Sequence, residues 1–269
     1  MKIQGSDVLD GERYKVNVLD RAVAVLKAFD SSHTNLTLSE IAARAELHVS
    51  TCLRLLSTLR AHGMLRRDED SGRYSLGYEI LVLAEIARGS GGLADWARPV
   101  MRELCEAFDE TVVLSVRSGD HRIDLDQVIG QQNVRRVISL GERKPLYAGA
   151  ASQVLLSGLP DRDIDEYLSR VSLAKLAEQT VTDVAELRRL LARIRRDGFA
   201  ESVQQQSDTG GAGVAAGIFD GRRQMVGAIG ISVPQYRFTP TLRAKLVPGV
   251  MAAADQISRI IGGRGRLTA

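Results

Sequence analysis

Two short amphipathic segments separated by a very brief joint restrict the fold of the N-terminal part of this chain. Residues Thr37–Glu40 have the pattern of a capping box, in which a Thr hydroxyl and a Glu carboxylate together cap the start of a helix. We expect that helix to run to about Ala45 and a second helix to occupy 49–62, so that only residues 46–48 separate them. A joint this short is typical of a helix-turn-helix.

The residues on either side of this motif complete a known module. An upstream helix is predicted from apolar residues at helical spacing, namely Val18, Ala22, Val23, Leu26 and Phe29. Gly63 should end the second helix of the motif. Strands at 64–67 and 73–76, around the polar turn 68–72, then predict a β-hairpin. A hairpin in this position is a wing, so residues 16–77 are expected to form a winged helix-turn-helix.

The second helix of the motif has the face that a DNA reader needs. Its core side is predicted to be Cys52, Leu55, Leu56 and Leu59. The opposite side carries small hydroxyl residues and Arg54, which suit a helix that enters the major groove. Leu53, at the edge of this side, is expected to pack rather than to contact a thymine methyl group. The candidate DNA-binding residues are Thr37, Ser39, Ser50, Thr51, Arg54, Ser57, Thr58, Arg66, Arg67 and Arg73.

Local charge supports the same interpretation. The net charge of the whole chain is only +3, but the stretch 49–67 contains arginines and no acidic residue. The tip of the wing, 68–70, is acidic, so the stem is the better candidate for contact with phosphate. The alternative is a winged helix that binds another protein through an ordinary basic face. Salt-dependent binding to duplex DNA distinguishes the two.

The rest of the chain is predicted to be a separate domain. Residues 78–92 are expected to form a linker helix followed by a small-residue hinge, and 1–15 and 264–269 to be flexible tails. The domain at 93–263 should be α+β, with helices packed on a mostly antiparallel sheet. The expected helices are 93–108, 150–157, 161–168, 183–197 and one that starts at Thr239-Pro240. The expected strands are 111–117, 122–129, 134–138, 199–205, 214–219 and 225–233.

Several functional classes find no support in the residues. No run of about 18 apolar residues is present, so no membrane span is expected. Cys52 and Cys105 should be buried, reduced thiols. An enzyme with an attached DNA-binding domain is the main rival, but His121 is the only histidine beyond the winged helix. Asp124 and Asp126 are expected to share one exposed sheet face. We therefore predict no catalytic site, no metal and no cofactor.

Specific motifs then make the chain similar to a known family. The run "LTLSEIA", the helix "STCLRLL" and the wing exit "GRYSLG" lie within 21–83, and "RRDGFAES", "GIFDGRRQMVGAIGIS" and "RFTP" lie in the C-terminal part. With these motifs the chain resembles the IclR family of bacterial transcriptional regulators over nearly its whole length beyond residue 15. The resemblance implies a GAF-like effector-binding domain, homodimers that often pair into tetramers, and control of catabolic or stress operons. It thus implies a cytoplasmic protein whose partners are double-stranded operator DNA, a small organic effector and a second copy of itself.

The resemblance also implies an effector pocket built from three places. They are the helix start near Leu146, Ala150 and Ala151, the strand near Ser202, and the inward strand positions Gly213, Gly230 and Ser232. Amides at the helix start could hold an anion or a carbonyl oxygen. Arg136, with Arg135 and Lys144, could add positive charge or form a solvated edge strand.

The chain departs from the family pattern inside this pocket. The family often has Cys at the position of Gly213 and a small polar residue at that of Gly230, and it has an acidic run where this chain has 202–206. Two missing side chains should enlarge the cavity. The hypothesis is therefore a ring-sized organic effector, for which an aromatic compound is one candidate, rather than a two-carbon acid.

Overall fold

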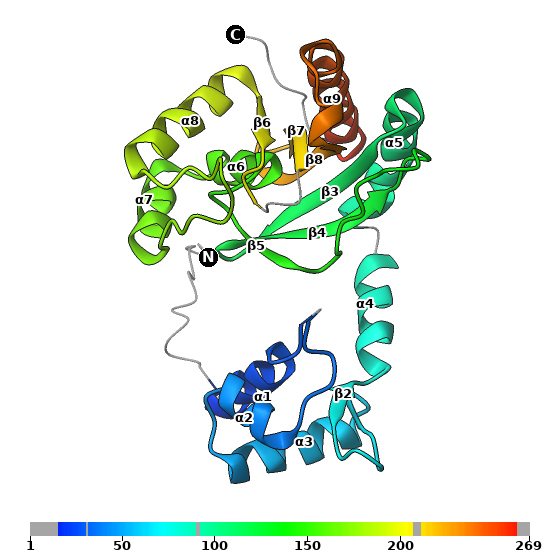
Figure 1. Ribbon diagram of the computed structural model, residues 1–269, viewed down its shortest axis with the longest axis vertical. Coiled ribbons are helices and arrows are strands. Elements are labelled where there is room, and N and C mark those ends of the chain that lie inside the picture. Colours follow the sequence, from blue (N-terminus) through cyan, green and yellow to red (C-terminus); the bar gives the residue numbers. More distant parts are fainter. Residues whose placement is uncertain (1–15, 31, 90–91, 207–210, 263–269) are drawn as a thin grey trace, which may run out of the picture. The chain divides into compact units, whose positions relative to one another are not determined.

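The computed structural model describes residues 16–30, 32–89, 92–206 and 211–262, and they form two compact units that divide between Ala87 and Arg88 (Figure 1). The division falls within residues 78–92, where a linker helix and a hinge are expected. Both predicted tails and the centre of the hinge lie outside the described residues. None of the described helices is both long enough and apolar enough to span a membrane.

The first unit is a winged helix-turn-helix, as predicted. Its elements are α1 Asn17–Lys27, α2 Leu38–Arg44, α3 Val49–Ala61, β1 Leu65–Arg67, β2 Tyr74–Leu76 and α4 Glu79–Gly89. β1 and β2 pair antiparallel, with Leu65 opposite Leu76. Leu36 exchanges two backbone hydrogen bonds with Tyr74, at 2.9 and 2.7 Å, so the segment before α2 holds the wing from its other side.

The prediction for α1 was partly wrong about which residues face the core. Val18 and Val23 are 57% and 45% exposed, whereas Val25 is fully buried. Val25 and Ala28 are buried in the cluster that this segment forms with α2 and α3, and Leu26 and Phe29 pack partly against it. Val18 and Val23 do not belong to this cluster. Tertiary packing, rather than hydrophobicity alone, therefore determines which face of α1 is buried.

The second unit is a six-stranded antiparallel sheet with helices on both faces (Figure 1). The strands are β3 Thr111–Ser118, β4 His121–Val128, β5 Arg143–Pro145, β6 Phe199–Val203, β7 Gly211–Phe219 and β8 Met225–Pro234, in the order β5-β4-β3-β8-β7-β6. One face is covered by α5 Leu93–Phe108 and α9 Pro240–Ile260. The other carries α6 Ala150–Ser157, α7 Asp161–Arg170 and α8 Val184–Asp197. This confirms the predicted α+β class.

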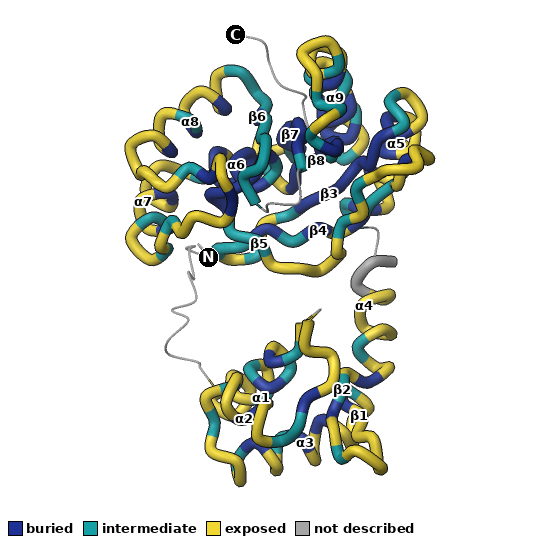
Figure 2. The backbone as a smooth tube through the Cα atoms, in the orientation of Figure 1, coloured by how far each residue is buried: buried dark blue, intermediate teal, exposed yellow. Residues whose placement is uncertain are grey.

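Alternation along the strands separates two cores. On β8, Ile229 and Ile231 pack into the core beneath α5 and α9, whereas Ala228 belongs to the cluster under α6 and α8. The next inward positions on that second face, Gly230 and Ser232, meet no such cluster and line a cavity instead. The centre of the sheet is thus buried on both faces (Figure 2).

The predicted strand at 134–138 does not exist, although this segment is held in place. Side chains satisfy its backbone where a neighbouring strand would have done so. The Gln127 amide donates to and accepts from the backbone of Ile138 at 2.7 and 2.9 Å. Thr111 Oγ1 donates to the Arg136 carbonyl at 2.6 Å. Besides β3, the strand that pairs with β4 is β5, which the sequence analysis missed.

The end of β6 and the start of β7 also differ from the predicted positions. β6 ends at Val203 rather than at 205, because Gln204 has a positive φ of 46°, which an extended strand cannot continue through. β7 already begins at Gly211, which pairs with Pro234 of β8. The last two helices both begin at a capping side chain, of which only Thr239 was predicted as a cap; Asp183 was expected to be the first residue of its helix. Asp183 accepts from Glu186 N at 2.7 Å, and the Thr239 side chain caps α9.

Tyr167 makes the stability of the second unit sensitive to alkaline pH. Its side chain is almost fully buried among α6, α7 and α8, and its hydroxyl accepts from Leu146 N at 3.1 Å. Burial is the main cause that raises the pKa of Tyr167 to about 12. The folded state therefore favours the neutral phenol, so this contribution is intact below the unfolded pKa of about 10 and is lost as the pH rises from about 10 to about 12.

We expect the free energy of unfolding to fall by roughly 2–3 kcal/mol across that interval because of this one group. Urea unfolding at pH 9, 11 and 12 measures it, with Tyr167→Phe as the control for all other titrations. The variant should lose less stability than the wild type over the same steps. Equal losses in both proteins would show that the phenol is not responsible.

Candidate nucleic-acid interface and ligand pocket

The start of α2 is capped as predicted. Thr37 Oγ1 accepts from Glu40 N at 3.3 Å, and Thr37 N donates to Glu40 Oε2 at 2.6 Å. These bonds from Thr37 hold the pKa of the Glu40 carboxyl below its ordinary value. Arg73 lies 3.2 Å from the same carboxylate and so ties the wing to α2. Thr37 and Arg73, both candidates for DNA contact, are thus already engaged in local structure.

His48 caps the start of α3, which the sequence analysis missed. Its Nδ1 accepts from Ser50 N at 3.4 Å and lies 2.8 Å from Ser50 Oγ. Glu46, in the joint, has a left-handed φ of 54°, which allows the tight turn between the two helices. His48 and Ser50 are exposed at the start of α3. The cap therefore orients the first side chains of the expected reading helix.

The two sides of α3 differ as predicted, with two corrections. Cys52, Leu56 and Leu59 are buried, but Leu55 is only half-buried. The other side is open to solvent at Ser50, Arg54, Ser57 and Thr58, and half-open at Thr51. Leu53 is 49% exposed and does not pack into the core, so it belongs to the open side. The candidate residues on α3 therefore do share one accessible surface.

The arginines of α3 and of the wing differ in whether other residues of the chain already contact their guanidinium groups. On the wing, Arg66 donates to the Tyr78 hydroxyl at 2.9 Å and stacks on that ring. Arg67 lies over the Tyr74 ring, 5.7 Å from its centre. Within the described part of the chain, the Arg54 guanidinium forms no hydrogen bond or ion pair. It is therefore available to an external partner at no cost in internal contacts.

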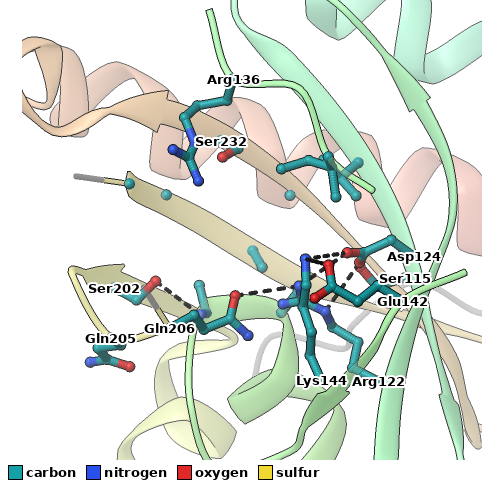
Figure 3. Close-up of a pocket in the computed structure, with 18 of the residues that line it drawn as sticks. Ser115, Arg122, Asp124, Arg136, Glu142, Lys144, Ser202, Gln205, Gln206 and Ser232 are labelled. Carbon is teal, nitrogen blue, oxygen red and sulfur yellow. Dashed lines mark hydrogen bonds and ion pairs between the residues drawn. The ribbon is translucent and has the colours of Figure 1, made fainter. Parts of the chain in front are cut away.

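A cavity of about 390 Å³ opens on the second face of the sheet in the C-terminal unit. Its walls include residues of all six strands, of the start of α6 and of the segment that follows β4 (Figure 3). Most of the predicted effector-binding residues meet here. They are Arg136, Ala150, Ala151, Ser202, Gly213, Gly230 and Ser232.

Leu146 is the predicted pocket residue that the structure places elsewhere. Its side chain is fully buried in the cluster under α6, α7 and α8, and it does not line the cavity. The neighbouring residues Lys144 and Pro145 do line it. The chain turns inward after β5, so the side chain at 146 enters the core instead.

The two glycines of the cavity floor have a structural reason besides space. A Cβ at Gly213 would lie 2.5 Å from the carbonyl oxygen of Ile231, and one at Gly230 would lie 2.9 Å from that of Val214. Both contacts are closer than side chains tolerate, so the close approach of β7 and β8 itself demands glycine. The two glycines still leave this part of the cavity without side chains. Because the backbone packing alone explains them, their presence does not by itself predict a large ligand.

The expectation for Asp124 and Asp126 was wrong. They are only 1% and 8% exposed, and they face opposite sides of the sheet. The pairing of β3 with β4 shifts register between Leu114 and Ser115, which places Asp126 opposite Leu114 and Asp124 opposite Ser115. This bulge turns Asp126 toward Arg98 of α5, at 2.6 Å, and turns Asp124 into the cavity.

Asp124 is the centre of a charged group that we call the Asp124 cluster: Ser115, Arg122, Asp124 and Lys144. Ser115 Oγ donates to Asp124 at 2.6 Å, Arg122 Nη2 at 3.1 Å and Lys144 Nζ at 3.3 Å. All four residues line the cavity (Figure 3). Arg122 and Asp124 are two residues apart on β4, and this spacing could have indicated that they lie on the same side of the sheet. The sequence analysis did not use it, because the bulge that separates Asp124 from Asp126 was not predicted.

The amides at the start of α6 already have partners from the chain itself. Gly149 N donates to Gln205 Oε1 at 3.1 Å, and Ala150 N donates to Ser202 Oγ at 3.0 Å. Gln206 donates to the Ala148 carbonyl at 2.7 Å. Ser202 thus acts as a helix cap, and the two glutamines are pocket residues that the sequence analysis did not name. A ligand anion at these two amides would have to displace them.

Two kinds of chemistry that the enzyme alternative could use are metal binding and attack by a thiol. Within that part of the chain, no three His, Cys, Asp or Glu side chains gather as metal ligands. Cys52 and Cys105 are buried, and burial raises the pKa of both thiols. A raised pKa keeps a thiol protonated and therefore a poor nucleophile.

Comparison with known proteins agrees with both units. Residues 18–69 match the model of the IclR helix-turn-helix domain, and residues 88–259 match that of the bacterial transcriptional regulator IclR C-terminal domain. The HTH-type transcriptional regulator KipR of Bacillus subtilis is 34% identical over 242 residues, which cover 90% of this chain and 96% of the relative.

Solved structures extend the likeness to three dimensions. An IclR transcriptional regulator from Alicyclobacillus acidocaldarius matches with a TM-score of 0.83 at 25% identity, over 93% of this chain and 100% of that one. An IclR homologue from Microbacterium hydrocarbonoxydans, in complex with 4-hydroxybenzoate, matches with a TM-score of 0.75 at 28% identity, over 91% and 98%. The matched domains and relatives are regulators of transcription and not enzymes. With its winged helix, its effector-type domain and these matches, the chain belongs to the IclR family of DNA-binding bacterial transcriptional regulators.

Proposed function

We propose that residues 16–77 read an operator through α3 and that a small organic molecule in the cavity of the 93–263 domain modulates this binding. The observation that carries the first part is the sidedness of α3. Its leucines and Cys52 are buried, whereas Ser50, Thr51 and Arg54 lie together on the open side. A helix of this kind fits the major groove of B-DNA, where small residues permit close approach and an arginine can reach a guanine edge.

The remaining candidate contacts divide into two sets by their geometry. Ser39 on α2, Ser57 on α3 and the wing residues Arg66 and Arg67 are suited to phosphate, because they flank the reading side and are exposed. Thr58 donates its hydroxyl to the Arg54 carbonyl at 3.2 Å, and so supports the helix beneath Arg54. Thr37 and Arg73 position α2 and the wing, as described above.

The cavity supports an effector of ring size. Its volume of about 390 Å³ is within the range of small-molecule sites. A homologue of similar fold was solved in complex with 4-hydroxybenzoate, which supports a ring compound as the class to test first. Effector binding would change operator affinity through a coupling free energy that is typically about 1–3 kcal/mol.

A second copy of the chain is the proposed partner of α4. Leu81, Leu83 and Ile86 are 63%, 44% and 64% exposed, and Ala84 is open as well. Burial of these side chains between two copies would pair two winged helices, as a palindromic operator requires. We propose a homodimer that pairs further into a tetramer, which acts in the cytoplasm and controls catabolic genes.

The test starts from genome-wide mapping of bound sites, which supplies a cognate promoter fragment. Fluorescence anisotropy then compares that fragment with a scrambled duplex at 50 and 200 mM salt. We expect preference for the cognate fragment and a loss of roughly a hundredfold or more in affinity at the higher salt. Equal affinity for both duplexes, or binding that does not respond to salt, would instead favour the protein-binding alternative.

A further inference from the structure

We propose that a second cavity in the C-terminal unit binds a small apolar amine, with Asp255 as the residue that receives the ammonium group. This second cavity has a volume of about 500 Å³ and is bounded by α6, α8, β7, the start of β8 and α9. Among the described residues it shares none of its lining with the cavity on the second face of the sheet. The proposal therefore concerns a further ligand of this chain and does not depend on the proposed function.

The second cavity lies where β7 extends past its neighbour at the edge of the sheet. β6 begins at Phe199, which pairs with Ala216, whereas β7 continues to Phe219. Among the described residues, 217–219 therefore have no strand on the β6 side. The Ser258 hydroxyl of α9 accepts from Phe219 N at 3.0 Å, so a helix satisfies the end of β7. The corner between α6, α8 and α9 is left open to a ligand.

The walls of the second cavity are mostly apolar and can adapt. Met225, Met251 and Phe219 line it together with aliphatic residues. A Cβ at Gly158 would lie 2.6 Å from Met225 Sδ, and one at Gly217 would lie 2.6 Å from Met225 Cε. The two glycines thus leave the room that the Met225 side chain occupies. Thioethers are flexible and polarizable, so they can pack against apolar groups of different shapes. A cavity of this volume with such walls suits the body of a small apolar molecule.

One of the two carboxylates in the second cavity already has a counter-charge. The charged side chains that line the cavity are Asp161, Arg195 and Asp255. Arg195 Nη1 donates to Asp161 at 2.6 Å. Its Nε and Nη2 donate to the carbonyls of Ser157 and Leu159, at 2.7 and 2.6 Å. Arg195 is thus engaged with the chain itself, and its charge is matched by that of Asp161.

Asp255 is the carboxylate that remains. It is half-buried at the cavity wall, and its side chain forms no hydrogen bond or ion pair with any described residue. Arg259, one turn further along α9, is exposed and does not pair with it in the described part of the chain. The lining residues therefore carry one negative charge in excess. A carboxylate is a strong acceptor for an ammonium group, so an amine with an apolar body matches both the charge and the walls.

The experiment compares amines with alcohols of the same shape. The probes are benzylamine, 2-phenylethylamine and hexylamine, each beside the alcohol in which a hydroxyl replaces the amino group. Titration calorimetry at pH 7 measures Kd for the full-length protein. We expect at least one amine to bind about tenfold or more tightly than its alcohol, because only the amine brings a positive charge to the carboxylate. The ratio of the two Kd values is the readout.

Variants then locate the preference in the second cavity. Asp255→Asn keeps the shape of the side chain and should lower the ratio of amine to alcohol affinity by about tenfold. Its melting temperature without ligand should equal that of the wild type, because Asp255 has no partner among the described residues to lose. Asp255→Lys places a like charge at the wall and should abolish amine binding. Asp95→Asn, at an exposed position of α5 that lines neither cavity, is the matched control and should leave the ratio unchanged.

Three results would overturn the assignment. They are alcohols that bind as tightly as amines, no binding by any amine of the set, and an unchanged ratio in Asp255→Asn, which would place the amine elsewhere in the protein. All of these titrations are made without DNA. Failure here would therefore leave the proposed operator binding untouched, and a protein that binds no operator could still show the amine site.

Discussion

Replacement of Arg54 by alanine is expected to weaken operator binding by about 1–3 kcal/mol, roughly 5- to 150-fold, and to leave the fold intact. Arg54 is exposed on α3 beside Ser50 and Thr51, and among the described residues its guanidinium has no internal partner to lose. Its removal should therefore cost contacts with DNA and little else. Anisotropy with the cognate fragment measures the loss, and thermal unfolding checks the fold.

The pattern of the loss also identifies what Arg54 touches. If it reads a guanine, affinity should fall for the cognate fragment and hardly change for a scrambled duplex. If it contacts phosphate, affinity should fall about equally for both, with a smaller dependence on salt. Arg102→Ala, at an exposed position of α5, is the matched control and should bind like the wild type. An Arg54→Ala protein with unchanged operator affinity would remove Arg54 from the reading surface.

The second large effect is expected on stability. Asp124→Ala should lower the free energy of unfolding of the second unit by about 3 kcal/mol, because it leaves Arg122 buried beside Lys144 with no carboxylate between them. This is the lower end of the usual cost of an unpaired buried charge, since water can enter the cavity. Urea unfolding followed by tryptophan fluorescence measures it, because Trp96 lies in α5 of the same unit.

Two further variants separate charge from packing. In Asp126→Ala the abandoned partner is Arg98, whose side chain is 47% exposed and can be hydrated, so the loss should be clearly smaller. Addition of Arg122→Met to Asp124→Ala should recover part of the stability, because the buried charge is removed as well. Equal losses in both aspartate variants, with no recovery in the double variant, would contradict this account.

Much of the first unit could be predicted because its determinants are local. The cap from Thr37 to Glu40, the short joint before Val49 and the helical spacing of Cys52, Leu56 and Leu59 are all read within a few turns of one chain segment. Hydrogen bonds of caps and turns join residues that are close in sequence, so both partners can be identified from one short segment. Where the first unit was mispredicted, at Val18, Val23 and Leu53, the deciding factor was which neighbouring helix covers the residue.

In the second unit, too, some features could be predicted from the sequence and others could not. Its class, most of its helices and most of its strands followed from periodicity and capping residues, and a resemblance to a known family located part of the cavity wall. The bulge that turns Asp124 into the cavity did not follow, because a register shift depends on how two strands meet. Nor did the segment around Arg136, whose backbone is held by side chains from β3 and β4.

What the sequence determined by itself, then, is the winged helix, the α+β class and the family, since each rests on patterns within single segments. What only the tertiary structure decided is the chemistry inside the cavity: Leu146 in the core, Ser202 as a helix cap and a buried charge cluster around Asp124. The physical reason is that burial and ion pairing are properties of residues far apart in the chain. Ser115, Arg122, Asp124 and Lys144 become one group only after three strands have paired in their final register.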